Sequence, residues 1–411
     1  MPSRAAATDS LLLALAIALS LGAAVSLGVT RFAYGLLLPP MRADLQWSYT
    51  LAGAMNTANA LGYLLGALMT PRLLRVLGPS TLLLGGGALA SLFMGLSGFF
   101  VDAAPLLVQR VLAGVASAFL FIAGSLLAAR LVAARPSRGG LLLGLYYGGT
   151  GLGIVLSALA VPALLDAARQ RPHGWAWAWW GLALACIAAT AVLAWPARAL
   201  RRMEQCAAGA APPMATPHSV FSWWRFAPAL AGYFMFGVGY IGYMTFVIAL
   251  LREQGEAPGR ITTFYALLGL AVLASSRIWA GLLDHFKGGQ ALAILNGLLA
   301  IATVMPALTG AWPLVLASGL LFGGVFLSVV ASTTALVRHN LPPSEWAVGI
   351  SAFTIVFAAG QIAGPTVVGW IADGPGGLAR GLVFSAGALA AGALLAWQQR
   401  ALDATSQWEP S

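Results

Sequence analysis

Long apolar segments constrain this chain more than any other feature of its sequence. Twelve such segments run for 20–28 residues each, without the polar and apolar alternation of a half-buried strand. A helix of about 20 residues, rising 1.5 Å per residue, crosses the hydrocarbon core of a bilayer. Lipid offers the backbone no hydrogen-bond partners, so only helices and closed barrels span it. We therefore predict an all-α membrane protein with twelve transmembrane helices.

The composition excludes a soluble protein. Only 8% of the 411 residues are charged and the mean hydropathy is +0.85, whereas soluble domains are about 25% charged. The first apolar segment is too long for a cleavable signal peptide and lacks a small-residue cleavage site. The net charge of +10 is explained by basic loops kept on the cytoplasmic side, so no nucleic-acid partner is predicted.

Basic residues give the chain an orientation in the membrane. With the N-terminus inside, thirteen Lys and Arg residues lie in inner segments and six in outer loops, so both termini are predicted to be cytoplasmic. A polar, Arg-rich stretch at 196–228 reads as a cytoplasmic linker between six-helix bundles at 1–195 and 229–411. The predicted spans are 11–38, 49–69, 79–101, 105–130, 139–165, 174–195, 228–251, 258–283, 288–310, 313–337, 344–371 and 377–398.

The two halves carry a matching glycine pattern. Gly149 and Gly153 in the fifth span correspond to Gly360 and Gly364 in the eleventh, with an offset of 360 − 149 = 211 residues in both cases. Small residues four apart let helix backbones approach closely in lipid. Their recurrence predicts a diverged repeat, and hence two pseudo-symmetric bundles.

Several motifs resemble those of the major facilitator superfamily. The stretch 277–289, Arg-Ile-Trp-Ala-Gly-Leu-Leu-Asp-His-Phe-Lys-Gly-Gly, is similar to its Gly/Asp/basic loop, with Asp284 as the acid. The equivalent loop after the second span departs from that pattern, since Thr70 and Pro71 stand where the acid is expected. Arg110 and Gly114 resemble the fourth-span Arg-xxx-Gly motif.

Three further stretches resemble the bacterial YbfB/YjiJ-type branch of this superfamily: 31–39, 56–63 and 145–153. The resemblance covers nearly the whole chain. It implies a secondary transporter of the bacterial inner membrane in which two bundles rock around a site near the membrane midplane.

Arginines within the spans have no acidic partners there. Arg31, Arg110 and Arg277 lie inside predicted helices, whereas all twelve Asp and Glu residues fall in loops, tails or span ends. An arginine at the centre of a membrane helix costs roughly 2.5–3.5 kcal/mol. Backbone carbonyls, polar side chains, water or a bound anion must offset that cost. The pattern favours a small organic anion, a carboxylate above all, as the cargo.

Arg31 is the leading candidate to bind this cargo, with Tyr34 on the same helical face. It resembles the first-span arginine of superfamily members that carry phosphate esters and organic anions. Arg277 resembles the eighth-span arginine of monocarboxylate carriers. The alternatives are a snorkelling or helix-bound Arg31, and an Arg277 that pairs with Asp284 as a gate residue.

Other polar residues are expected to line the site or to hold the helices. Arg110 and Gly114 are predicted to hold the first and fourth helices together, and Arg72, Arg75, Asp284 and Lys287 to form cytoplasmic latches. Buried tyrosines and amides need hydrogen-bond partners, which a polar cavity supplies, although helix packing or an interfacial position is the alternative. The candidates of this kind are Asn59, Tyr63, Tyr146, Tyr147, Tyr240, Tyr243 and Gln361, while Tyr233 is assigned to the interface.

No residue pattern in the sequence indicates catalysis, a metal site or a cofactor. The four histidines lack metal-ligand spacing, and no phosphate-binding glycine motif is present, so neither an enzyme nor an ATP-driven pump is predicted. The expected partners are a small solute and the lipid bilayer, and the chain is expected to act as a monomer. Efflux of neutral or amphiphilic compounds is the alternative, and it would favour a Met- and Phe-rich cavity. A sensor without transport would need a signalling domain that the short linker and tails do not provide.

Overall fold

The structure is a computed structural model that describes residues 4–134, 139–207, 221–342 and 345–402. The described residues form helices and short connections, and twelve helices among them are long and apolar enough to cross a membrane. The prediction of an all-α membrane protein is confirmed. The helices are α1 Arg4–Ala23, the π-helix η1 Ala24–Phe32, α2 Tyr34–Leu45, α3 Tyr49–Leu77, α4 Pro79–Ser97, α5 Ala103–Ala134, α6 Gly139–Ala167, α7 Trp175–Ala207, the 3-10 turn η3 Trp224–Phe226, α8 Ala227–Glu253, α9 Pro258–Ile278, α10 Ala280–His285, α11 Gln290–Leu308, α12 Trp312–Asn340, α13 Trp346–Ala372 and α14 Gly377–Trp397.

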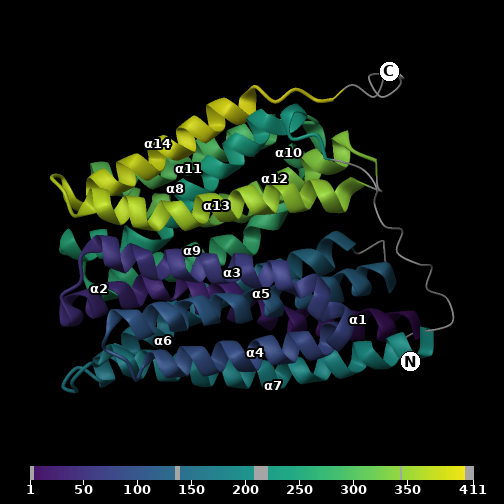
Figure 1. Cartoon of the computed structure of the whole chain (residues 1–411), viewed down its shortest axis with the longest axis horizontal. Coiled ribbons are helices and arrows are strands. Elements are labelled where there is room, and N and C mark those ends of the chain that lie inside the picture. The colour runs from purple at the N-terminus through teal and green to yellow at the C-terminus, as the bar shows by residue number, and fades with distance from the viewer. Residues whose placement is uncertain (1–3, 135–138, 208–220, 343–344, 403–411) are drawn as a thin grey trace.

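The helices form two bundles that lie side by side (Figure 1). The N-terminal bundle holds α1 to α7 and the C-terminal bundle holds α8 to α14. The start of α1 and the end of α14 lie at the same end of the molecule, which we call the near end. The opposite end, with the connections after α2, α8 and α13, is the far end. The bundles contact each other through α3 and α13 and through α6 and α9.

The glycine repeat packs the same pair of helices in each bundle. Gly149 lies against the Ser20 carbonyl of α1, and Gly153 lies against Gly28 of η1. In the C-terminal bundle, Gly360 and Gly364 of α13 lie against α8 in the same manner. A Cβ at any of these positions would overlap the neighbouring backbone. The fifth helix therefore packs closely on the first in both bundles, as expected for two pseudo-symmetric halves.

Several helices extend past prolines that were predicted to end them. The first span continues through Pro39 and Pro40 to Leu45, and the second continues through Pro71 to Leu77. Helix α7 continues through Pro196 to Ala207, so the connection between the bundles begins later than predicted. Pro212 and Pro213 of the predicted linker lie outside the described residues. Neighbouring helices can satisfy the carbonyls that a proline frees within a membrane helix.

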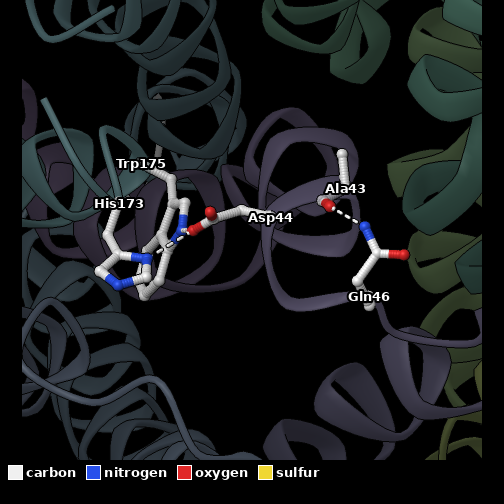
Figure 2. Close-up of polar contacts among 5 residues, drawn as sticks. All are labelled: Ala43, Asp44, Gln46, His173 and Trp175. Atoms are coloured by element: carbon white, nitrogen blue, oxygen red, sulfur yellow. Dashed lines mark hydrogen bonds and ion pairs between the residues drawn. The ribbon is translucent and has the colours of Figure 1, made fainter. Parts of the chain in front are cut away.

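The far end of α2 is anchored to the loop before α7 (Figure 2). Asp44 accepts a hydrogen bond of 2.5 Å from the Trp175 indole and lies 2.6 Å from Nδ1 of His173. On the other side of the helix, Gln46 donates from its side chain to the Ala43 carbonyl, 2.7 Å away. These contacts hold the far end of the first span, which contains Arg31.

Candidate functional site

Arg31 lies on a stretch of unusual helix geometry. The first span is α-helical over Arg4–Ala23, becomes a π-helix over Ala24–Phe32 and returns to α-helix at Tyr34. A π-helix is rare and occurs frequently at functional sites. It displaces the side chains that follow from the face they would occupy on a regular α-helix. No residue pattern in this segment predicts a π-helix.

The Arg31 guanidinium is buried without protein partners for two of its nitrogens. The residue is 3% exposed, and its Nε and Nη2 atoms make no hydrogen bond within the part of the chain that the structure describes. A lost hydrogen bond to a charged group costs about 1.5–3 kcal/mol. Such an arrangement is costly for a purely structural residue, because a buried charge is normally paired. It leaves two donors free to bind a visiting anion.

Tyrosines from both bundles lie near this guanidinium. Its charge lies within electrostatic range of the hydroxyls of Tyr63 on α3 and Tyr240 on α8. Tyr240 is 3% exposed and donates to Oε1 of Gln361 on α13, 3.2 Å away. Tyr147 on α6 is 38% exposed and lies within electrostatic range of Tyr63. The structure thus brings Arg31 near Tyr63 and Tyr240, with Gln361 bonded to Tyr240 and Tyr147 near Tyr63.

Arg110 lies close to Arg31 but is fully engaged by the protein. Its Nη1 donates to the Thr30 carbonyl at 2.9 Å, its Nη2 to Oδ1 of Asn56 at 2.9 Å, and its Nε to the Met55 carbonyl at 3.3 Å. These bonds tie α5 to the first span and to α3. Asn59 donates to the Arg110 carbonyl, and a Cβ on Gly114 would overlap the Asn59 carbonyl.

Three tyrosines predicted to line the site use their hydroxyls elsewhere. Tyr34 donates to the Ala52 carbonyl at 2.8 Å, and its ring lies under the Arg110 guanidinium, 4.9 Å from the centroid. Tyr146 donates to the Phe121 carbonyl, and Tyr243 shares a hydrogen bond with Ser318, both at 2.7 Å. All three are at most 1% exposed. Tyr34 was expected to share a face with Arg31; its side chain contacts Ala52 and Arg110.

Arg277 and the predicted latch residues lie at the near end and are exposed. Arg277 is in the last turn of α9, which breaks at Trp279 instead of continuing as predicted. Among the described residues, no ion pair joins the four latch residues to one another or Arg277 to Asp284. The structure therefore does not bring Arg277 to Arg31, and Arg72, Arg75, Asp284 and Lys287 are not engaged across the bundles in this state.

An aromatic wall, which the sequence analysis missed, lies beside Tyr240. We define it as Phe236 and Tyr240 of α8, Phe326 of α12 and Phe357 of α13. The Tyr240 ring stacks on Phe236, Phe357 and Phe326 with centroid distances of 4.7, 5.6 and 6.1 Å. Tyr233, assigned to the interface from sequence, is 2% exposed and stacks on Phe357 at 4.9 Å. The i, i+4 spacing of Phe236 and Tyr240 was the available signal.

Contacts at the far end close the bundles over this region. The Asp373 carboxylate of α13 accepts hydrogen bonds from the amides of Tyr49 and Thr50 and from the Thr50 hydroxyl, at 2.6–2.8 Å. Tyr49 also donates to Glu253 of α8. Partial burial would raise the pKa of Asp373, but these hydrogen bonds and the nearby Arg42 lower the pKa below its ordinary value. We call Tyr49, Thr50, Glu253 and Asp373 the far-end latch.

Comparisons with known proteins give one matching family and a shared fold. Residues 23–397 match the family described as "Uncharacterised MFS-type transporter YbfB". The nucleoside transporter NupG superimposes with a TM-score of 0.70 at 12% identity, covering 97% of this chain and 100% of that one. A bacterial homologue of the human lysosomal transporter Spinster, inward-facing and occupied, gives 0.62 at 15% identity over 98% and 99%. At such identities the likeness shows the fold alone. Comparison with curated protein sequences gives no match.

Proposed function

The chain belongs to the YbfB family of transporters in the major facilitator superfamily, and from this premise we propose that it carries a small organic anion, a carboxylate, across the bacterial inner membrane by alternating access. In this proposal both termini are cytoplasmic, the near end faces the cytoplasm, and one chain is the working unit. The basic residues counted above support that orientation.

One observation carries the anionic cargo: the buried Arg31 guanidinium with Nε and Nη2 unpaired among the described residues. These two nitrogens form the edge of the guanidinium that binds a carboxylate in a bidentate manner. Arg110, which is equally buried, has donors committed to Thr30, Met55 and Asn56. The contrast assigns binding to Arg31 and helix attachment to Arg110.

The far-end latch supports alternating access. Its bonds join α3 of one bundle to α8 and α13 of the other. Among the described residues, the near-end side chains Arg72, Asp284 and Lys287 are exposed and make no ion pair. We propose that this state is closed toward the outside and that the latches exchange when the bundles rock. Arg277 enters the cycle as a near-end residue that meets cargo on release.

The coupling proposal follows from the same lack of buried acids. All twelve carboxylates of the sequence lie outside the span interiors, so a carboxylate proton relay is not part of the scheme. Facilitated diffusion, exchange, or symport in which the cargo itself carries the proton remains. Uptake into proteoliposomes with and without a pH gradient tests this. Strict coupling with a cargo that does not titrate would contradict the proposal.

Thermal-shift screening of a carboxylate library against the wild type, Arg31→Ala and Arg31→Lys tests the cargo assignment. Carboxylates should stabilise the wild type and neither variant, because an ammonium cannot reproduce the planar fork of a guanidinium. Losing one bidentate charge-assisted contact should weaken binding about 10- to 150-fold. Arg169→Lys is the matched control, since Arg169 is an exposed far-end residue that faces Asp166. Equal stabilisation of all four proteins would refute the anchor role of Arg31.

Efflux of neutral or amphiphilic compounds is the second candidate function. The aromatic wall favours it, because three of its four members are phenylalanines beside the proposed site. NupG, which shares the fold, is a nucleoside transporter, so a neutral nucleoside belongs in the library as a test ligand. Neutral compounds that bind the wild type and Arg31→Ala equally well would favour this function over the anion carrier.

A further inference from the structure

The aromatic wall and the unpaired arginine lie on opposite bundles, near the contact between Phe32 and Phe326. Arg31 belongs to η1 of the N-terminal bundle, whereas Phe236, Tyr240, Phe326 and Phe357 belong to the C-terminal bundle. Phe32, the residue after Arg31 in η1, contacts Phe326 of the wall, with ring centroids 5.9 Å apart, and Phe326 stacks on Tyr240. A molecule bound to Arg31 would therefore extend its remaining atoms toward these rings.

The wall is nearly continuous and uniformly oriented. Its four rings come from three helices, and those of Phe236, Phe326 and Phe357 lie within 9–23° of the Tyr240 plane. Phe322 and Tyr233 extend the stack at its two ends. Leucine or valine would be sufficient to exclude water at such a surface. Parallel rings in addition offer offset-stacked and edge-on contacts to another ring.

One aromatic contact between the bundles must break during alternating access, and the space it leaves can hold an aromatic ring of the cargo. Phe32, the neighbour of Arg31, meets Phe326 across the bundles edge to face, with centroids 5.9 Å apart and planes at 89°. When the bundles separate, Phe326 loses this aromatic partner. A ring attached to the anion at Arg31 can then replace the edge of Phe32 against the wall.

The polar groups near the wall are few. The hydroxyl of Tyr240 is engaged by Gln361, and the other three members of the wall have no polar atoms. Hydroxyl groups on the body of a cargo would therefore lose water without gaining partners there. A cargo with one charged group and an otherwise apolar body therefore matches Arg31 and the aromatic wall.

From these observations we infer that the cargo is an aromatic carboxylate, whose carboxylate binds Arg31 and whose ring packs on the wall of Phe236, Tyr240, Phe326 and Phe357. This inference rests on the proposed function and narrows it. It excludes short aliphatic acids and sugar acids as the main cargo.

Calorimetry on the purified protein in nanodiscs tests the inference with benzoate, cyclohexanecarboxylate, acetate and benzamide. Benzoate should bind about 2- to 10-fold more tightly than cyclohexanecarboxylate, the advantage that an aromatic pair adds beyond burial. Acetate should bind far more weakly than either, and benzamide should not bind. The wild type alone gives these comparisons, so the test does not depend on any variant folding.

Phe357→Leu tests whether the preference for benzoate over cyclohexanecarboxylate comes from the aromatic wall. Phe357 is the least buried member of the wall, so this substitution is the mildest available there. It should remove the preference for benzoate over cyclohexanecarboxylate, whereas Phe99→Leu, at a residue that is 70% exposed, should leave the preference intact. Phe326→Leu serves as the second wall variant.

The outcomes separate the inference from the proposed function. If carboxylates bind through Arg31 without any preference for an aromatic ring, the aromatic cargo is refuted but the anion carrier is not. The same conclusion follows if the preference for a ring persists in both wall variants. Benzamide binding as tightly as benzoate would overturn the anionic anchor. If none of the three carboxylates binds, both proposals fail.

Discussion

Removing the Asp373 carboxylate should open the far end of the protein. In the closed state this carboxylate accepts three hydrogen bonds from the first turn of α3, at 2.7, 2.8 and 2.6 Å. A side chain that caps a helix start in this way contributes about 0.5–2 kcal/mol. Because three hydrogen bonds are lost, we take about 1–2 kcal/mol for Asp373→Ala, which corresponds to a 5- to 30-fold change in the ratio of open to closed molecules.

Reaction of a single cysteine with a membrane-impermeant maleimide measures that ratio. Ala249 is 3% exposed and lines a cavity at the far end with Arg42 and Tyr49, so Ala249→Cys reports opening. The natural Cys186 and Cys206 are replaced by alanine. Labelling from outside should be 5- to 30-fold faster in Asp373→Ala, in proportion to the open fraction.

Asp166→Ala is the control for this experiment. It removes an exposed carboxylate that faces Arg169 within the N-terminal bundle and makes no bond across the bundles among the described residues. Its labelling rate should equal that of the parent protein. An unchanged rate in Asp373→Ala, or an equal acceleration in both variants, would refute the reasoning that Asp373 holds the far end closed.

Three further predictions follow from the same structure. Arg110→Leu leaves three oxygens without their donor and should lower the free energy of unfolding by about 3 kcal/mol or more. Arg31→Leu should not lower it, because the buried Arg31 charge costs roughly 2.5–3.5 kcal/mol and has little pairing to offset that cost. Thermal unfolding without ligand compares the two variants, and equal destabilisation would contradict the two roles. Gly53→Ala should favour the open far end, because its Cβ would overlap the Pro365 carbonyl across the bundles. Gly85→Ala, whose Cβ would meet no atom nearby, should not change the far end. Equal maleimide labelling of Ala249→Cys in both variants would contradict this prediction. The closed far end should be insensitive to pH from about 8 to 5, because the pKa of Asp373 is lowered in the closed state; it should lose stabilisation only below the ordinary aspartate pKa of 3.8. Spin-label distances between Asp102→Cys and Gly310→Cys should lengthen only in that acid range. A transition near pH 6 would exclude Asp373 as its source.

The fold was predictable because lipid leaves few alternatives. Spans of about 20 apolar residues must be helices, and the paired glycines identify the close helix contacts of both bundles. Helix ends were less predictable. Pro39 and Pro71 read as terminators in sequence, yet neighbouring helices let α2 and α3 continue past them.

Arg31 was identifiable because its charge contrasts with its surroundings, but its neighbours were not. Placing Tyr34 beside it assumed a regular α-helix, whereas Arg31 lies within a π-helix that ends at Phe32. The aromatic wall had no comparable contrast. In lipid, inward and outward faces are both apolar, so hydropathy does not distinguish the 2% exposed Phe326 from the 70% exposed Phe99.

A structure of the protein with a brominated form of its tightest-binding carboxylate would locate the cargo at or away from Arg31. Anomalous scattering from bromine would place the cargo without ambiguity. We expect carboxylate oxygens within about 3.2 Å of Nε and Nη2 of Arg31. A carboxylate bound elsewhere, with both of these nitrogens bonded to protein oxygens, would contradict it.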